Sequence, residues 1–199
     1  MMPSFRRRPF LRRGRLLSPR RRIARDLPPV ARETLRRLKR AHDLLAQDQP
    51  AEAAVIFDEL AEAGAKRGIP RAPQLYLQAG RAWIEAGEVE RGVQRLDTGL
   101  DLMDQMQQIR RLPFVSQRIL NELTDRGLAD HAAVLEDKIQ SLLAAHGLSL
   151  AAASSTTTKP QLPTKCSYCG GSILPDEVEW FDNQQASCTY CGSLLEAKS

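Results

Sequence analysis

Apolar residues recur three or four positions apart through most of this chain, from about residue 30 to residue 146. This spacing places them on one face of an amphipathic helix. Proline, glycine and capping residues separate the successive stretches and mark where helices begin and end. The pattern predicts six helices, over about residues 30–47, 50–64, 73–86, 89–106, 113–126 and 128–146.

The periodicity stops in a stretch dominated by Ser, Thr, Ala and Pro, which is typical of a linker. Beyond it, Val178, Trp180 and Phe181 favour a short strand, and residues 185–187 favour a returning strand after a turn. We therefore expect a mainly α protein, with three helical hairpins followed by a small β unit. The predicted parts are residues 1–27 (tail), 28–147 (helices), 148–164 (flexible linker) and 165–196 (β unit).

An internal repeat runs through the helical part. Its clearest copy combines aromatic and small residues at fixed positions: Tyr76, Ala79, Gly80, Trp83, Gly87, Gly92 and Leu96. Related patterns lie 39 residues earlier, around Ala53, and 40 residues later, around Ala132. Over about residues 30–146 the chain resembles the tetratricopeptide repeat family. A generic helical bundle with small and large residues in alternation is the other interpretation.

The resemblance implies roles for individual residues. Small residues in that family let the two helices of a repeat cross closely, so Gly80 and Gly92 would be the points of closest approach. Tyr76 and Trp83 would fill the hollow between the same helices. Two features depart from the family pattern: the spacing is 39–40 residues rather than 34, and the usual closing proline is missing.

All four cysteines lie in two C-x-x-C-G pairs, Cys166 with Cys169 and Cys188 with Cys191. Eighteen residues separate the pairs, which is the spacing of a four-thiolate metal site. Such sites hold one ion in a tetrahedron, so we expect one Zn²⁺ per chain, with iron as the second option. The alternatives are two disulfides or four ordinary thiols. Disulfides need an oxidising compartment, which no secretory signal supports, and ordinary buried thiols would not repeat C-x-x-C-G twice.

From about Lys165 to Leu195 the chain resembles the zinc ribbon family and, more distantly, rubredoxin. The resemblance implies that the four cysteines ligate the metal, while Tyr168 and Trp180 shield the sulfurs. About 30 residues are too few for a self-sufficient apolar core. Metal binding should therefore contribute much of the folding free energy, which is about 10–16 kcal/mol for structural zinc in small peptides.

Charge is unevenly distributed. Residues 1–25 contain ten arginines and no acidic residue, whereas the other 174 residues carry 19 basic and 24 acidic side chains. Like charges at this density repel, so we expect a disordered arm. The arm is either a plain solvated tail or an electrostatic contact for RNA, DNA or anionic lipid.

The sequence contains no nucleophile elbow, phosphate-binding loop or H-E-x-x-H pattern, and a four-thiolate zinc leaves no open position. We therefore expect a protein that is not an enzyme. No run approaches the roughly 18 apolar residues of a membrane span, and the arginine-rich start lacks the apolar stretch of an export signal, so the expected location is cytoplasmic. The leading interpretation is an adaptor whose helical repeats and ribbon contact a protein partner. The alternatives are a nucleic-acid-associated protein that uses residues 1–25, and rubredoxin-like electron transfer.

Overall fold

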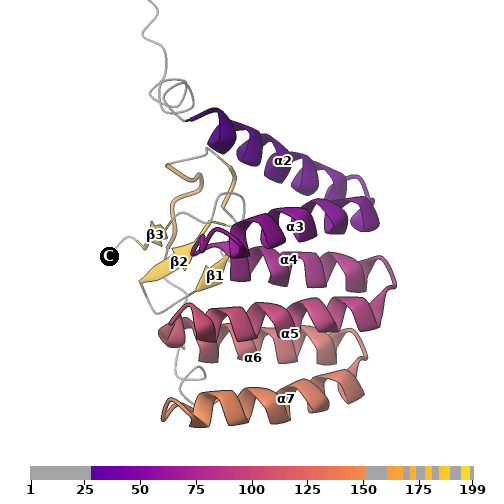
Figure 1. The fold of residues 1–199 in the computed structure, drawn as a ribbon, viewed down its shortest axis with the longest axis vertical. Coiled ribbons are helices and arrows are strands. Elements are labelled where there is room, and N and C mark those ends of the chain that lie inside the picture. The colour runs from indigo at the N-terminus through magenta and orange to yellow at the C-terminus, as the bar shows by residue number, and fades with distance from the viewer. Residues whose placement is uncertain are drawn as a thin grey trace, which may run out of the picture.

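The computed structural model describes residues 28–150, 161–167, 171–173, 178–180, 184–188 and 194–197. This part of the chain is mainly helical, with short strands near the C-terminus (Figure 1). The predicted disorder of residues 1–27 concerns a segment outside the described residues. The helices are α2 (Pro29–Leu45), α3 (Pro50–Ala65), α4 (Ala72–Glu85), α5 (Val89–Gln105), α6 (Leu112–Asp125) and α7 (Ala129–Ala144), with a 3₁₀ turn η1 (Ile109–Arg111) before α6.

The six α-helices match the six predicted stretches and lie one after another in chain order, each reversing the direction of the last (Figure 1). Two apolar clusters fill the stack. The first joins α2 and α3 to one face of α4, and the second joins another face of α4 to α5, α6 and α7. Helix α4 is thus shared by both clusters, which explains why nearly all its side chains are buried.

The helices end in a common way. After each one a residue adopts a positive φ, and the N–H of the following residue donates to a carbonyl five positions earlier, which is the Schellman motif. The positive-φ residues follow one another at intervals of 19 or 20 positions: Asp48, Gly68, Gly87, Gln107, Gly127 and Gly147. Two such intervals make the repeat of 39–40 residues that the sequence predicts. The glycines are expected there, whereas Asp48 and Gln107 are not.

The predicted close approach of Gly80 and Gly92 is confirmed. A Cβ atom placed on Gly80 would lie 2.8 Å from the carbonyl oxygen of Gly92 and 2.8 Å from Cγ of Leu96. A Cβ atom on Gly92 would lie 2.7 Å from the carbonyl oxygen of Gly80. Gly99, which the sequence does not single out, plays the same part: a Cβ atom placed on it would lie 2.6 Å from Cδ2 of Leu77. Three glycines therefore set the distance between α4 and α5.

The expected position of the two aromatics is wrong. Tyr76 and Trp83 belong to the cluster between α3 and α4, not to the space between α4 and α5. The indole Nε1–H of Trp83 donates to Oδ2 of Asp58 on α3, at 2.9 Å. The reason is angular: at 3.6 residues per turn, the mean direction of Tyr76 and Trp83 lies roughly 70° around α4 from the mean direction of Gly80 and Ile84. Two arginines of α5 contact the aromatic rings: the guanidinium carbon of Arg91 lies 3.6 Å from the Trp83 ring centroid, and that of Arg95 lies 5.9 Å from the Tyr76 ring centroid.

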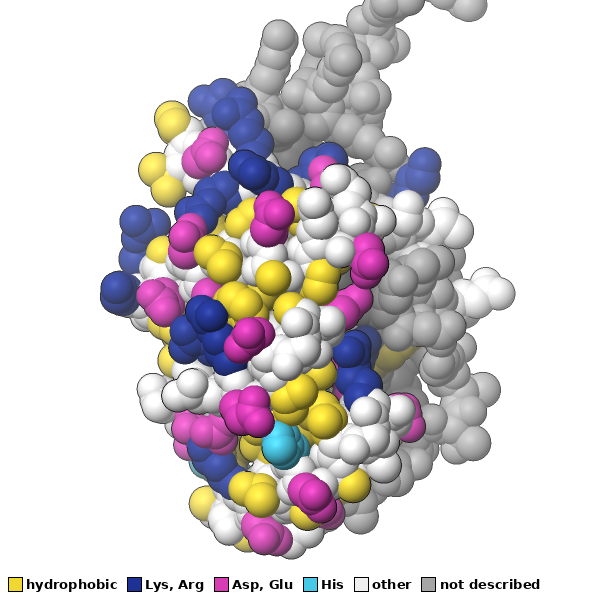
Figure 2. Space-filling model, turned by 90° about the vertical axis from the view of Figure 1, so that its right-hand side faces the viewer, with side chains coloured by type: hydrophobic (Ala, Val, Ile, Leu, Met, Phe, Trp, Pro, Cys, Tyr) yellow, Lys and Arg dark blue, Asp and Glu magenta, His cyan; other side chains and the backbone are white. Residues whose placement is uncertain are grey.

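The surface is charged but not uniform. Figure 2 views the end of the stack where the α2–α3, α4–α5 and α6–α7 turns lie. Lys and Arg side chains gather toward the end of this face that carries α2, and apolar side chains appear in scattered patches between charged ones (Figure 2).

Candidate metal centre

The described C-terminal residues, from 161 to 197, form a small unit that we call the β unit. Its strands are β1 (Glu179–Trp180), β2 (Gln185–Ser187) and β3 (Leu194–Glu196), in one antiparallel sheet of order β1-β2-β3. The first two strands lie where the sequence predicts them. The third is a finding of the structure.

The first cysteine pair lies in a hairpin. Lys165 pairs with Ser172 in an antiparallel bridge. The backbone N–H of Cys166 donates to the carbonyl oxygen of Gly171 at 2.9 Å, and the N–H of Ile173 donates to that of Thr164 at 3.1 Å. These contacts bring residues 164–166 and 171–173 together as antiparallel segments.

The second pair lies in an equivalent hairpin. In the β2–β3 ladder, Ser187 pairs with Leu194. In both hairpins the residue before the first cysteine pairs with a residue seven positions later, which is the third residue after the second cysteine. The residues that flank the two C-x-x-C segments thus pair in the same register.

One cysteine from each pair enters the same apolar cluster. Cys166 and Cys188 are 0% and 1% exposed. Their buried neighbours come from both hairpins and from the sheet: Ile173, Val178, Ala186 and Leu195. Trp180 packs against this cluster, as its predicted shielding role requires. The structure therefore brings together two of the four predicted ligands, although they lie 22 positions apart in the sequence.

The other two predicted ligands, Cys169 and Cys191, lie outside the described residues, as does Tyr168. Among the residues that the structure describes, no three His, Cys, Asp or Glu side chains gather as a metal-binding group. That part of the chain contains only two of the four cysteines.

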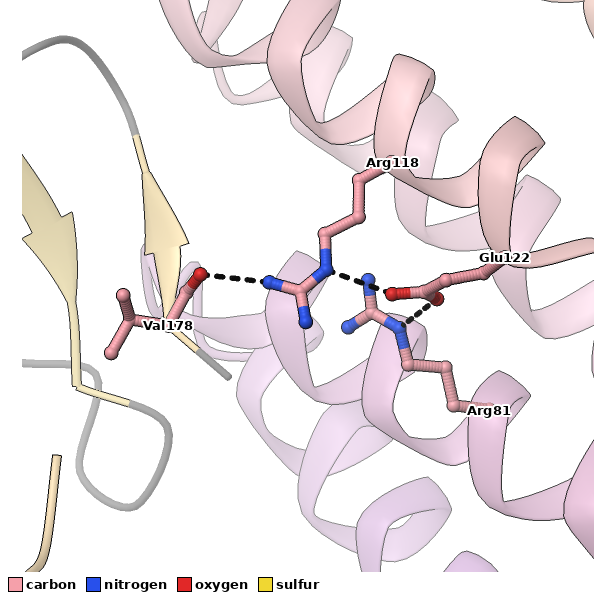
Figure 3. A network of polar contacts seen from close by, with 4 residues as sticks. All are labelled: Arg81, Arg118, Glu122 and Val178. Atoms are coloured by element: carbon pink, nitrogen blue, oxygen red, sulfur yellow. Dashed lines mark hydrogen bonds and ion pairs between the residues drawn. The ribbon is translucent and has the colours of Figure 1, made fainter. Parts of the chain in front are cut away.

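The β unit rests on the helices. Strand β1 lies against α6, and Nη1 of Arg118 donates to the carbonyl oxygen of Val178 at 2.8 Å (Figure 3). Nε of Arg118 donates to Oε1 of Glu122 at 2.8 Å, and Nε of Arg81 donates to Oε2 of the same carboxylate at 2.7 Å. One carboxylate thus joins α4, α6 and, through Arg118, the β unit. The sequence carries no signal for this contact, because an arginine on a helix surface is ordinary.

The charge of Glu122 depends on this network. Burial raises the pKa of Glu122, but the charges and hydrogen bonds of Arg81 and Arg118 outweigh burial, so the pKa lies below its usual value. Glu122 is therefore ionised at neutral pH and holds the Arg118 guanidinium toward Val178.

The two ends of the predicted linker, residues 148–164, contact the rest of the described chain. The N–H of Leu148 donates to the carbonyl oxygen of Leu143, and Leu148 and Leu150 pack against the helical core. At the other end, Leu162 packs against the cluster that contains the cysteines. Apolar side chains at both ends of the segment explain these contacts. Arg118 also joins the two parts directly.

The histidines lie apart from the cysteines. The rings of His42 and Phe57 meet edge to face, with centroids 5.3 Å apart, and Nε2 of His146 is paired with Oδ1 of Asp104 on α5.

Comparison with family models, curated proteins and solved structures finds no match to this chain. No helix in the described part of the chain is both long and apolar enough to cross a membrane.

Proposed function

We propose that this protein is a non-catalytic, zinc-binding adaptor. Its β unit is a zinc ribbon in which Cys166, Cys169, Cys188 and Cys191 hold one Zn²⁺ as thiolates. The observation that carries the proposal is the shared register of the two hairpins. Two hairpins with the same register would each supply one pair of cysteine sulfurs in the same geometry, and together they would surround one ion.

The surroundings of the cysteines support a metal. A thiolate buried among apolar side chains is costly unless a cation compensates its charge. The strands of the β unit are two or three residues long, and its core is a single small cluster, so apolar burial alone is a weak source of stability. Bound zinc would supply a closed structural centre that takes no substrate.

The helices supply the other half of the proposal. The regular interval of the helix ends and the approach of Gly80 to Gly92 support a tetratricopeptide-like array of three hairpins. Arrays of this kind offer extended surfaces to a peptide or a partner helix. Because Arg118 ties the β unit to α6, the partner would meet the two modules in one fixed arrangement.

Zinc content tests the metal part. Wild-type protein and the control Ser167→Ala, which changes an exposed residue beside a ligand, should each contain about one zinc per chain by elemental analysis. Cys166→Ser and Cys188→Ser should lose most of it. Iron in place of zinc would favour electron transfer, and neither metal in the wild type would refute the ribbon.

Reconstitution tests the adaptor part. Proteins retained by the full chain after nuclease treatment would be identified, purified and mixed with wild-type protein and with Cys188→Ser. We expect a direct complex that the wild type forms and that weakens when the ribbon is lost. The adaptor would be contradicted if nuclease removed every protein that the full chain captures and if the purified proteins formed no complex. That result would favour a nucleic-acid-associated protein.

A further inference from the structure

The first helix differs in charge from the rest of the array. Helix α2 carries five basic and two acidic side chains, a net charge of +3. Residues 46–150 carry 11 basic and 16 acidic side chains, a net charge of −5. The positive charge of the described helices is therefore concentrated at one end of the stack, which is where Figure 2 shows Lys and Arg gathered.

The basic residues of α2 form an ordered row. Arg32, Arg36 and Arg40 are each four positions apart, so they lie about 6 Å from one another along one side of the helix. Lys39 lies beside them, and all four are exposed. The opposite side of α2, with Leu38, Ala41 and Leu44, is buried toward α3. We call Arg32, Arg36, Lys39 and Arg40 the basic face of α2.

The charges of the basic face are only weakly neutralised by other residues of the described chain. Arg37 is not part of it, because Arg37 is paired with Glu59 on α3. Arg36 lies 3.5 Å from Glu33, and Lys39 is paired with Asp43. All four side chains are at least half exposed, and ion pairs that exposed contribute little to stability. Arg32 and Arg40 make no ion pair within the described part of the chain.

We propose that the basic face of α2 binds the phosphate backbone of nucleic acid. Planar guanidinium groups match phosphate oxygens with two parallel hydrogen bonds, and a row of them suits a polymer with closely spaced charges. Contacts of this kind carry no base sequence information. The proposal concerns a described surface and does not depend on residues 1–25 or on the adaptor function.

An anionic membrane is the less suitable partner. A helix that lies on a bilayer presents large apolar side chains beside its basic ones. On α2 the apolar side chains Leu38, Ala41 and Leu44 are turned inward, and the residues between the arginines on the outer side are polar. Of the large apolar side chains of α2, only Val30, at the start of the helix, is exposed, at 63%.

The test uses the full chain with three arginines changed together, Arg32→Gln, Arg36→Gln and Arg40→Gln. A matched control carries Arg67→Gln, Arg110→Gln and Arg126→Gln. These three arginines are also exposed, and the control loses the same amount of charge at positions outside α2. A third protein has lysine in place of the three α2 arginines, so that charge is kept. Circular dichroism confirms that each is folded. Binding to a fluorescent DNA duplex and an RNA duplex is titrated from low to physiological salt.

Each lost phosphate contact lowers the slope of log affinity against log salt by about 0.9. We expect the α2 glutamine variant to lose about two to three units of slope and at least about tenfold in affinity at low salt. The control and the lysine variant should stay near wild type. Equal slopes for the α2 variant and the control would overturn the proposal. So would binding to phosphatidylserine vesicles that depends on these arginines when duplex binding does not.

Discussion

The helical array and the β unit hold themselves together in different ways. The array is packed through two large apolar clusters and through glycines that bring α4 and α5 into close contact. The β unit has one small cluster, which includes the buried Cys166 and Cys188, and strands of two or three residues. The comparison teaches that one chain combines a part that apolar burial stabilises with a part whose fold we attribute to a metal ion.

Metal removal should separate the two parts most strongly. A strong chelator should unfold the β unit, because structural zinc contributes about 10–16 kcal/mol in comparable small domains. The helices should keep their circular dichroism. Amide spectra recorded before and after chelation would show the loss for residues 161–197 only. Unchanged signals from the β unit in fully metal-free protein would show that the β unit does not need a metal to fold.

Overpacking should damage the array alone. Gly80→Leu places a side chain where a Cβ atom already meets the Gly92 carbonyl oxygen, so we expect a loss of about 1–3 kcal/mol or more in the free energy of unfolding. Ala133→Leu, at an exposed helical position, is the matched control and should change stability little. Urea denaturation followed at 222 nm measures both. Metal content should be unchanged in either variant, and its loss would show that the two parts depend on each other.

The contact between the two parts should be weaker than either core. Arg118→Met removes the hydrogen bond to the Val178 carbonyl oxygen, at a cost of about 1–2 kcal/mol. Arg126→Met, at an exposed position directly after the same helix, is the control. Nuclear magnetic relaxation should show wild type and control tumbling as one body, whereas the β unit of Arg118→Met should reorient faster than the helices. Equal tumbling in all three proteins would mean that other contacts hold the β unit.

The smallest expected effect depends on pH. The folded-state pKa of Glu122 is below its usual value of 4.5, so its stabilisation is present above that pH and is lost as pH falls through the folded-state pKa. Glu122→Gln should therefore be less stable than wild type at neutral pH, and the gap should close in acid. Glu85→Gln, at an exposed position on α4, should show no such trend. A gap that is constant with pH would rule out ionised Glu122 as the cause.

The sequence predicts the helices well, because their periodicity and their terminal glycines are local signals. It also predicts the approach of Gly80 to Gly92, because a repeat records which small residues face each other. It misplaces Tyr76 and Trp83, because the repeat does not say which of two neighbouring helices an aromatic face meets. The positive φ of Asp48 and Gln107 is missed because these two helix ends lack the glycine that usually occupies this position of a Schellman motif.

The candidate metal centre is predictable in part. Cysteine spacing selects the ligands, and the structure adds what spacing does not contain, namely equal register in the two hairpins and a shared buried cluster for Cys166 and Cys188. The contact with α6 could not be predicted. It depends on Arg118 reaching the backbone of a residue 60 positions away, and backbone carbonyls carry no sequence signature.

X-ray absorption at the zinc edge, recorded on purified wild-type protein, tests the central claim most directly. The account predicts one zinc per chain, surrounded by four sulfur atoms at roughly 2.3 Å. A first shell that contains nitrogen or oxygen would mean that at least one of the four cysteines is not a ligand. A purified protein without zinc or iron would contradict the metal-dependent fold of the β unit altogether.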